Sequence, residues 1–519
     1  MATQISECPL HLGPAEQFAQ VRGVLKAAAY NEETFFKILK IEQMSDVGNI
    51  NFNSIDFSDA PAQFQLFCRL FFGQRSLPLR DVEAALEADQ LNAFFLLGLL
   101  GTSRTDRDVV YARVLLYPVA GFLIASDRHT NPDGSAFIAP ADIVFPAIYG
   151  GTLLFLKVLP KTRADQALDL GSGTGIGAFV LSRCNKLAVA SDLTQRATDF
   201  ATFNRALNDV TNVEVVRGDL YSAVKGRTFD RIVAHPPYVP SLDNTAIWRD
   251  GGVTGEALAR RIIERLPEYL RPGGTACIVT LGLDTQEGAF EERARQWLKD
   301  AADEFDIIFA YTNERTPDEV LRDLRERNAY CDLVEQLSGL QKAFTEAGIV
   351  RMPHGAIVLR RCLEPSNRQP WTFRVKLSEV TEGADFESAS QLHEYFLKEG
   401  SVRQLAEARL TLAPRLEVKA THVVYEGSLV PAEFIFETDK PFAARGRVDK
   451  WMIPLFTELD GKSTLAEIYE RRRLAGDLPD GFLLDDLTSL VARMVERGFL
   501  RVPTDFTDYT NGQLLMTKA

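Results

Sequence analysis

The stretch Asp169-Leu-Gly-Ser-Gly-Thr-Gly175 decides the fold of this 519-residue chain. It follows a short apolar run, Gln166–Leu170, which predicts a β-strand, and it opens a helical pattern over Gly175–Arg183. Glycines let a strand turn sharply into a helix while the backbone passes close to a bound ligand, because a Cβ would obstruct the approach. This stretch therefore predicts the first ligand-binding turn of a βαβ sheet.

The same alternation continues on both sides of the glycine-rich stretch and predicts a domain over residues 135–363. Apolar runs of strand length alternate with amphipathic runs of ten to fifteen residues, which is typical of a parallel sheet. The strands are predicted at Ala188–Ser191, Val213–Arg217, Asp230–Ala234, Thr275–Thr280, Phe305–Tyr311 and Gly355–Arg360, and the helices at Thr194–Asn208 and Glu256–Leu270. The charged segment Thr316–Ala347 predicts a helical insertion.

Two further regions flank this domain. Residues 1–134 predict a mainly helical region that ends in two strands, Val109–Leu116 and Gly121–Ser126. Helices followed by a short hairpin are typical of a winged helix, and an irregular helical cap explains the pattern equally well. Residues 364–400 predict a linker and a helix, 401–505 a small domain, and 506–519 a frayed tail.

The small domain at 401–505 resembles the winged-helix domains related to the peptide-binding PqqD fold. The turn Asp460-Gly461 leads to a helix N-cap at Ser463 or Thr464, and the strand Gly498–Val502 follows the last helix. The run Arg471-Arg-Arg473 is interpreted as a solvated helix face, with contact to a phosphate or an acidic peptide as the alternative.

Composition restricts the class of protein. The net charge of −13 and the pI of about 5.2 disfavour a nucleic acid as the main substrate, because phosphate binding usually requires a basic surface. The six cysteines form no CxxC pair, which favours reduced thiols in the cytoplasm and gives no zinc-type cluster. Met1–Gln20 lacks the pattern of a signal peptide, and no apolar run is long enough to cross a bilayer, so no membrane association is expected.

Acidic residues follow the next two strands and indicate the kind of ligand that this sheet would bind. Asp192 stands a little over twenty residues after Asp169, where a carboxylate accepts hydrogen bonds from both ribose hydroxyls of a nucleoside, and Asp219 follows the third strand. A helix cap at Asp192 and a plain loop acid at Asp219 are the alternatives. A dinucleotide requires an uncluttered helix N-terminus for its pyrophosphate, so Asp169 counts against a dinucleotide as the ligand.

These positions resemble the class I S-adenosylmethionine-dependent methyltransferases. The resemblance implies an α/β fold with a Rossmann-like seven-stranded sheet, in which Asp169 lies near the methionine part of the cofactor and Asp219 beside its adenine. The cofactor-binding residues that it implies are Asp169, Gly171, Gly173, Gly175, Asp192, Leu193, Asp219 and Leu220. Thr152 is a further candidate over the cofactor, with an ordinary helix residue as its alternative, and Asn204 is expected to be structural.

The segment His235-Pro-Pro-Tyr238 follows the fourth strand, where the reaction centre is expected. It resembles the Asn/Asp/Ser-Pro-Pro-aromatic motif of amino-methyltransferases, and most of all that of the protein-glutamine (release-factor) methyltransferases. Arg249-Asp-Gly-Gly252, Arg260-Arg-Ile-Ile263 and Leu270-Arg-Pro-Gly-Gly274 also match that group. The resemblance implies that residue 235 orients the acceptor nitrogen, that Pro236 stiffens the loop, and that Tyr238 stacks on a planar acceptor.

His235 departs from the motif, because an imidazole cannot mimic the paired donor and acceptor of a carboxamide. One interpretation is methylation of a nitrogen on a protein or peptide side chain, or on a small molecule. Alternatives are a small-molecule O- or N-methyltransferase with His235 as base, a nucleic-acid base amino-methyltransferase, and a regulatory protein that binds the cofactor without catalysis. His129 is a weaker candidate in a polar turn.

Overall fold

The computed structural model describes residues 8–103, 106–132, 135, 137–243, 246–327, 333–363 and 369–502. The chain divides into two compact units, Met1–Phe309 with Glu314–Thr372, and Ala310–Asn313 with Phe373–Ala519. The boundary expected at 134/135 therefore lies inside the first unit, and the predicted tail 506–519 lies outside the described residues. No helix in the described ranges is long and apolar enough to cross a membrane.

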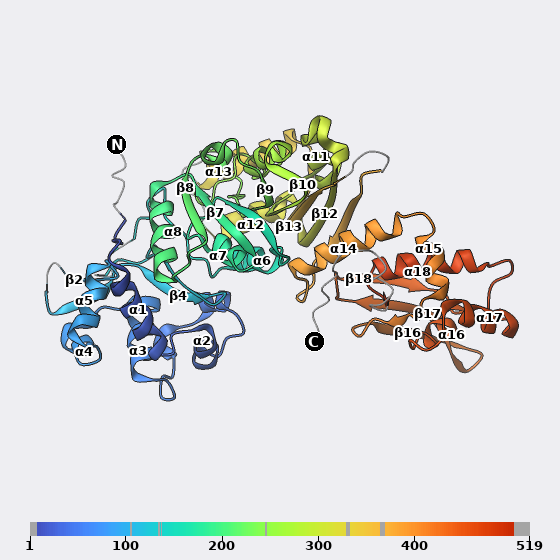
Figure 1. The fold of residues 1–519 in the computed structure, drawn as a ribbon, viewed down its shortest axis with the longest axis horizontal. Helices are drawn as coiled ribbons and strands as arrows, with labels where there is room; N and C mark the ends of the chain where they lie inside the picture. Colours follow the sequence, from blue (N-terminus) through green and yellow to red (C-terminus); the bar gives the residue numbers. More distant parts are fainter. Residues whose placement is uncertain are drawn as a thin grey trace. The chain divides into compact units, whose positions relative to one another are not determined.

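A large mixed sheet forms the centre of the first unit (Figure 1), with strand order β12-β13-β10-β9-β6-β7-β8. The pairs β9–β10, β6–β9, β6–β7 and β7–β8 are parallel, and β13 runs antiparallel to β10. The strands are β6 (Ala164–Leu170), β7 (Asn185–Asp192), β8 (Val213–Arg217), β9 (Phe229–Ala234), β10 (Leu270–Leu281), β12 (Phe305–Arg315) and β13 (Ile349–Arg361), and the short β11 (Asp284–Thr285) pairs with β13.

From β6 the chain adds β7 and β8 on one side, and then returns to add β9 and β10 on the other side of β6. The boundary between β6 and β9 is therefore the place where a ligand site is expected. β6 and β9 are adjacent and parallel, with Leu170 opposite Ala234. The glycine-rich stretch follows Leu170 and His235 follows Ala234, so both motifs leave the sheet at one edge. In open α/β sheets, ligands bind outside the carboxyl ends of the strands at such a switch point.

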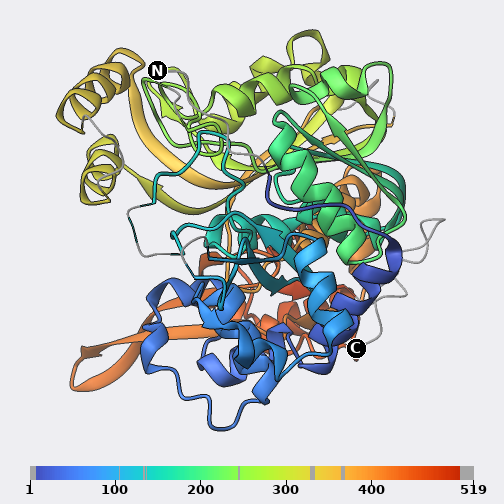
Figure 2. The same ribbon diagram turned by 90° about the vertical axis from the view of Figure 1, so that its left-hand side faces the viewer.

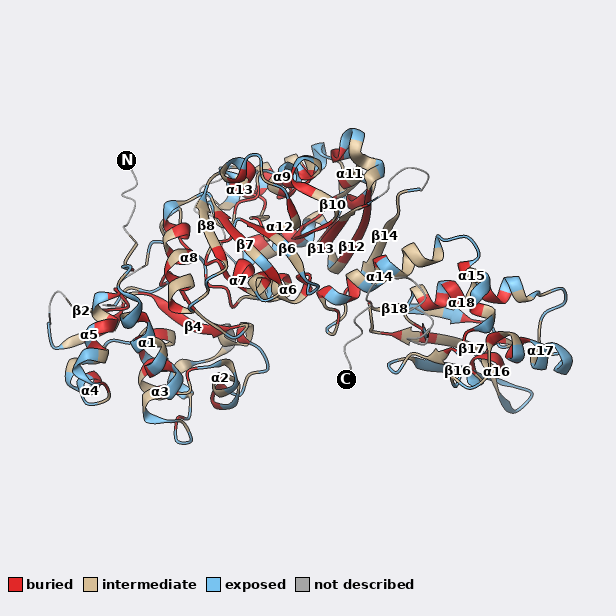
Figure 3. Ribbon diagram, viewed as in Figure 1, coloured by how far each residue is buried: buried red, intermediate tan, exposed pale blue. Residues whose placement is uncertain are grey.

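Helices pack around this sheet, whose central strands are mostly buried (Figure 3). Alternating βαβ order accounts for this layering, because a buried parallel strand needs apolar cover on both faces. The helices are α6 (Gly150–Val158), α7 (Ile176–Ser182), α8 (Gln195–Leu207), α9 (Ala257–Glu264), α10 (Leu266–Tyr269) and α11 (Phe290–Trp297).

The N-terminal region is mainly helical, as predicted. Its elements are α1 (Ala15–Ala27), α2 (Glu32–Leu39), α3 (Ala62–Phe67), α4 (Leu79–Glu83), α5 (Ala88–Leu96), the sheet of β1 (Leu77–Pro78), β3 (Val109–Ala112) and β2 (Leu100–Thr102), and the hairpin of β4 (Leu115–Val119) and β5 (Phe122–Ser126). Phe35 and Phe71 are fully buried, so these aromatics form core. Phe18 packs on Phe203, 5.2 Å between ring centroids, where α1 and α8 lie side by side (Figures 1 and 2).

Two asparagines join α8 to the edge of β5. The Asn204 side chain accepts from the Ala125 N–H (2.8 Å) and donates to the Ala125 carbonyl (2.9 Å). Asn208 pairs in the same way with both backbone groups of Leu123, at 2.8 and 2.7 Å. Asn204 also donates to the Thr174 carbonyl in the glycine-rich stretch (3.0 Å). The structural role expected for Asn204 is confirmed, because backbone groups occupy both of its polar atoms.

The predicted insertion is a pair of helices between β12 and β13, α12 (Pro317–Glu326) and α13 (Leu333–Glu346). Its apolar side packs on Tyr238, Val239 and Leu242. Gln336 accepts from the Leu242 N–H (3.3 Å) and donates to Asp243. The insertion therefore supports the chain segment that follows the His-Pro-Pro-Tyr motif.

The second unit has a core of its own, formed largely by its last three helices and β17. Thr464 caps α17 by accepting from the Glu467 N–H (3.2 Å), as the sequence predicts. The elements are β14 (Thr372–Lys376), α14 (Gly383–Phe396), α15 (Ser401–Gln404), paired β15 (Thr411–Leu412) and β19 (Leu500–Arg501), the antiparallel sheet of β16 (Glu417–Tyr425), β17 (Ser428–Thr438) and β18 (Ala444–Val448), and α16 (Met452–Thr457), α17 (Leu465–Ala475) and α18 (Leu484–Glu496).

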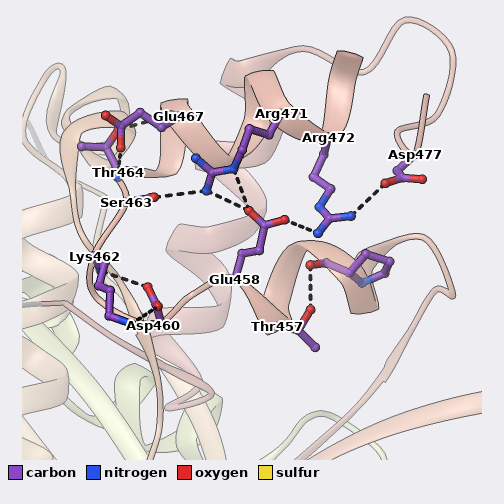
Figure 4. Close-up of polar contacts among 11 residues, drawn as sticks. Thr457, Glu458, Asp460, Lys462, Ser463, Thr464, Glu467, Arg471, Arg472 and Asp477 are labelled. Carbon is purple, nitrogen blue, oxygen red and sulfur yellow. Dashed lines mark hydrogen bonds and ion pairs between the residues drawn. The ribbon is translucent and has the colours of Figure 1, made fainter. Parts of the chain in front are cut away.

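The arginine run of α17 is neutralised within this unit (Figure 4). Glu458 accepts from both Arg471 and Arg472, and Arg472 also pairs with Asp477 at 2.9 Å. Arg473 pairs with Glu470 at 2.8 Å. These ion pairs agree with the interpretation of a solvated helix face.

Candidate active site

A cavity of about 340 Å³ opens at the carboxyl ends of β6, β7, β8 and β9. Its lining includes all but one of the predicted site residues: Thr152, Asp169, Gly171, Gly173, Asp192, Leu193, Asp219, Leu220, His235, Pro236 and Tyr238. The exception is Gly175. We call the part around the glycine-rich stretch, Asp192 and Asp219 the donor half, and the part around His235–Tyr238 and α6 the acceptor half.

The glycine-rich stretch forms the floor of the donor half. Gly171 and Gly173 have φ of +69° and +52°, and no atom lies within 4 Å of the point where a Cβ would stand. A positive φ strongly favours glycine, and the absent side chains leave open space for a ligand. Gly175 has φ +86° and caps α7, where a Cβ would stand 2.8 Å from Phe179, so this glycine serves the turn.

Asp192 presents a fixed carboxylate at the end of β7. Its Oδ2 accepts from the Gly173 N–H (2.9 Å) and its Oδ1 from the Thr194 N–H (3.1 Å). Burial raises the pKa of this carboxyl, and these backbone hydrogen bonds oppose the rise. The carboxylate is therefore held in position before any ligand arrives.

Asp169, the first residue of the glycine-rich stretch, is only 2% exposed. Its Oδ2 accepts from the Ala178 N–H at 2.9 Å. Burial raises the pKa of Asp169 to about 7, and the nearby charge of Asp192 adds to the rise. A positively charged ligand would reverse this shift, because an opposite charge favours the ionised carboxylate.

The remaining donor-half residues follow β7 and β8. Leu193 is 48% exposed and offers an apolar surface to the cavity. Asp219 pairs with Arg261 at 2.6 Å, and both side chains are about half exposed. Ser172 was not predicted from the sequence; it lines the cavity with a buried hydroxyl for which the described part of the chain offers no hydrogen-bond partner.

His235 is the centre of the acceptor half. Its Nε2 is buried and has no hydrogen-bond partner among the residues that the structure describes. Burial, with a smaller contribution from repulsion by a protonated His354, lowers the pKa of His235 to about 3. The Tyr238 ring lies between the two imidazoles, 5.7 Å from His235 and 5.0 Å from His354. His235 is therefore a neutral imidazole at physiological pH.

The helix α6 supports the His235 ring. Phe155 stacks on it with centroids 5.7 Å apart and planes 22° apart. A Cβ on Gly151 would lie 3.2 Å from His235 Cε1, from His235 Nε2 and from the Tyr238 hydroxyl. Thr152, the next residue, also faces the cavity. Gly151 and Phe155 were not predicted, because a Gly-Gly pair and a phenylalanine in an apolar helix give no signal of their own.

The loop at 249–255 closes tightly around Tyr238. A Cβ on Gly251 would lie 2.6 Å from the Tyr238 Cα and 2.8 Å from the Pro237 carbonyl oxygen. A Cβ on Gly255 would lie 2.4 Å from the Tyr238 carbonyl oxygen. The glycines after Asp250 therefore permit a backbone approach that positions the motif.

An aromatic stack lines the mouth of the cavity and was also missed. Phe145 lies between Tyr149 (4.8 Å, 26°) and Trp248 (4.4 Å, 7°), and remains 39% exposed. The two segments meet through the Ile247 N–H, which donates to the Ala141 carbonyl (3.1 Å). Aromatic residues a hundred positions apart cannot be paired from sequence alone. His129 is exposed and does not line the cavity.

Comparison with known proteins identifies the family. The methyltransferase small domain matches residues 147–296. A Methanocaldococcus jannaschii protein, to which protein N5-glutamine methyltransferase activity is attributed, is 32% identical over 139 residues, covering 25% of this chain and 70% of that protein. The ribosomal protein uL3 glutamine methyltransferase of Bradyrhizobium diazoefficiens is 26% identical over 249 residues, covering 43% and 77%. A Xylella fastidiosa release factor glutamine methyltransferase is 32% identical over 131 residues, covering 23% and 48%.

The fold, the cavity and these similarities define an S-adenosylmethionine-dependent methyltransferase of class I, and the cofactor prediction is confirmed at that level. Within this class, the chain belongs to the family that contains the protein N5-glutamine methyltransferases, to which it is related at modest identity.

Proposed function

We propose that the protein methylates the side-chain amide nitrogen of a glutamine in a protein substrate. The observation that carries the proposal is the buried Nε2 of His235, which no described residue hydrogen-bonds and which lies beside the donor half. The similarity to methyltransferases of release factors and of ribosomal protein uL3 supports the protein substrate.

The donor half fits S-adenosylmethionine. Gly171 and Gly173 leave a cradle that any Cβ would fill, and the Ser172 hydroxyl is buried without a partner. In the proposed complex, Asp192 binds the ribose hydroxyls and Asp169 faces the methionine end, while Leu193, Asp219, Leu220 and Thr152 surround the rest. When bound, the cofactor supplies a methyl group already activated on a sulfonium.

The acceptor half would orient the amide. An amide nitrogen is a poor nucleophile because its lone pair is delocalised, so catalysis depends on positioning. A neutral imidazole accepts one hydrogen bond at its unprotonated nitrogen. In the proposal, Nε2 of His235 accepts from the amide N–H, Tyr238 lies against the planar amide, and Pro236 keeps the loop stiff. A pKa of about 3 makes His235 too weak a base to be a proton acceptor near pH 7, so the proton that the amide nitrogen loses on methylation passes to water, and the demethylated cofactor leaves as a neutral thioether.

The test is methyl transfer from radiolabelled S-adenosylmethionine to purified release factor and ribosomal protein uL3, followed by mass spectrometry of the labelled peptide. We expect a single N5-methylglutamine, and a loss of about 100-fold in turnover for His235→Ala, whose cofactor affinity should stay unchanged. Label on a carboxylate, a lysine or a nucleic acid, or no label on any protein despite tight cofactor binding, would refute the proposal.

A second candidate is methylation of a small planar molecule, and the aromatic stack of Tyr149, Phe145 and Trp248 favours it. Such a stack offers an apolar surface of the kind that small-molecule sites use. Substitution of Trp248 by Ala separates the two candidates. A flat small acceptor would lose most of its affinity, whereas a glutamine presented by a large protein surface would lose little.

We further propose the layout of the flanking parts. In this layout, a mainly helical N-terminal domain at 1–134 precedes the methyltransferase domain at 135–363. A linker and helix at 364–400 then lead to a winged-helix-like domain at 401–505. The last three helices and the three-stranded sheet of that domain support this assignment. A cytoplasmic location is supported by the cysteines, since none of the five described is in a disulfide.

A further inference from the structure

Three groups restrain the imidazole of His235, and α6 provides two of them. Gly151 and Phe155 are four positions apart, so they lie on one face of the helix. Phe155 stacks on the ring face, and the Gly151 backbone lies at the edge that carries Cε1 and Nε2. Tyr238 lies against the ring on the third side. The imidazole therefore has little room to shift.

Gly151 is required by this geometry and not by its backbone conformation. A Cβ there would stand 3.2 Å from two imidazole atoms and from the Tyr238 hydroxyl at once. Carbon atoms in ordinary contact are about 3.5–4.0 Å apart, so the imidazole or the tyrosine would have to shift by a few tenths of an ångström. The neighbouring Gly150 has no atom within 4 Å of its Cβ position and does not line the cavity. Gly150 is therefore a matched control.

We propose that Gly151 is a positioning residue: because it has no side chain, it leaves the space that the imidazole of His235 needs. Its missing side chain spares the Cε1–Nε2 edge of the imidazole a steric clash, so that the ring keeps its orientation beside Tyr238. An asparagine at position 235 lacks the outer ring atoms that approach Gly151, so that residue would leave room for an alanine at 151. The role of Nε2 in this inference rests on the proposed function. The steric fit between Gly151 and the imidazole does not depend on it.

The experiment compares Gly150→Ala, Gly151→Ala, His235→Asn and the double variant Gly151→Ala/His235→Asn in the full-length protein. The measurements are affinity for S-adenosylhomocysteine by calorimetry, thermal unfolding, methyl transfer to the glutamine protein, and NMR of ¹⁵N-labelled histidines. The chain has six histidines, and the signal lost in His235→Asn assigns His235.

Gly150→Ala should match the wild type in cofactor affinity, in the His235 signal and in turnover, and it should not lower the unfolding temperature. Gly151→Ala should keep the affinity for S-adenosylhomocysteine, shift the His235 signal and lower turnover by about 10-fold or more, because small displacements near the reacting atoms are costly. In the His235→Asn background, the same alanine should change turnover and unfolding temperature far less. Alanine also favours helix over glycine, so general helix damage would not explain a loss.

The inference is wrong if Gly151→Ala leaves both the His235 signal and turnover unchanged, or if its cost is equal in both backgrounds. If the wild type methylates no protein glutamine, the proposed function fails on its own. The NMR comparison of Gly150→Ala with Gly151→Ala, and the cycle of unfolding temperatures, still decide the steric match.

Discussion

The two halves of the cavity are built in different ways. The donor half uses backbone conformation and charge: glycines at positive φ, the buried carboxylate of Asp169 and the partly buried carboxylate of Asp192, each of which accepts hydrogen bonds from backbone N–H groups. The acceptor half uses shape: rings from α6, from the loop after β9 and from two rim segments, around an imidazole that is neutral at physiological pH. The donor half is therefore specified by a short stretch of sequence, whereas the acceptor half depends on distant segments coming together.

The largest expected effect concerns the donor half. Asp192→Ala removes a carboxylate that two backbone N–H groups hold in place, and we expect about 100-fold weaker binding of S-adenosylmethionine, since hydrogen bonds to charged groups contribute roughly 1.5–3 kcal/mol. Asp219→Ala is the comparison. Its carboxylate is half exposed and paired with Arg261, so the loss should be about 5-fold. Calorimetry measures both, and equal losses would contradict the ordering.

Gly251→Ala tests whether shape controls the acceptor half. The added Cβ would stand 2.6 Å from the Tyr238 Cα and from the Gly255 carbonyl oxygen, so the loop must move. We expect turnover to fall by about 10- to 100-fold while cofactor affinity changes little. Gly23→Ala, in α1, has open space at its Cβ and serves as the control. A parallel loss of cofactor affinity would show that the halves are not separable.

The third prediction concerns the charge in the donor half. The pKa of Asp169 is raised to about 7, so below pH 7 the free protein carries a proton there that a cationic ligand must displace. Affinity for S-adenosylmethionine should rise with pH, by up to about 10-fold per unit below 7, and level off above 8. Calorimetry at pH 6.5 in two buffers should detect proton release. Asp169→Asn should abolish both effects, and if it keeps them another group is responsible.

The smallest effect is expected in the pH profile of turnover at saturating cofactor. His235 and His354 have pKa values lowered by burial to about 3 and about 4, so both remain neutral from pH 6 to 8. Neither group changes its protonation in that range, and turnover should vary by less than about 2-fold. An acidic limb with a midpoint near 6.5, absent in His235→Asn, would restore the interpretation of His235 as a base.

These contrasts explain how far the sequence was informative. Strand, glycine turn and acid follow one another within one βαβ unit, so Asp169, Asp192 and the glycines were predicted together and line one cavity, Gly175 excepted. The motif at His235 was also found. Its environment was not, because a pKa near 3 arises from burial by α6 and by Tyr238, which no local pattern records.

The helices and strands of the fold were predicted from local pattern, whereas their packing was not. The alternation of strands and helices predicted the sheet of the first unit, and the charged run at Thr316–Ala347 predicted the inserted helices. That these helices pack on Val239 and Leu242, directly after the His235–Tyr238 motif, depends on tertiary contacts. The contact of the N-terminal region with α8 likewise depends on side chains such as Phe18 and Phe203, far apart in the chain.

The asparagine pairs on α8 imply a route for communication. The side chains of Asn204 and Asn208 hydrogen-bond to the backbone of β5 as a neighbouring strand would. Asn204 also donates to the carbonyl of Thr174 in the glycine-rich stretch. When the cofactor tightens that stretch, the amides of Leu123 and Ala125 should exchange their hydrogens with solvent more slowly. Deuterium uptake by the hairpin of the N-terminal region would then report whether the cofactor is bound. This measurement does not require the methyl acceptor to be known.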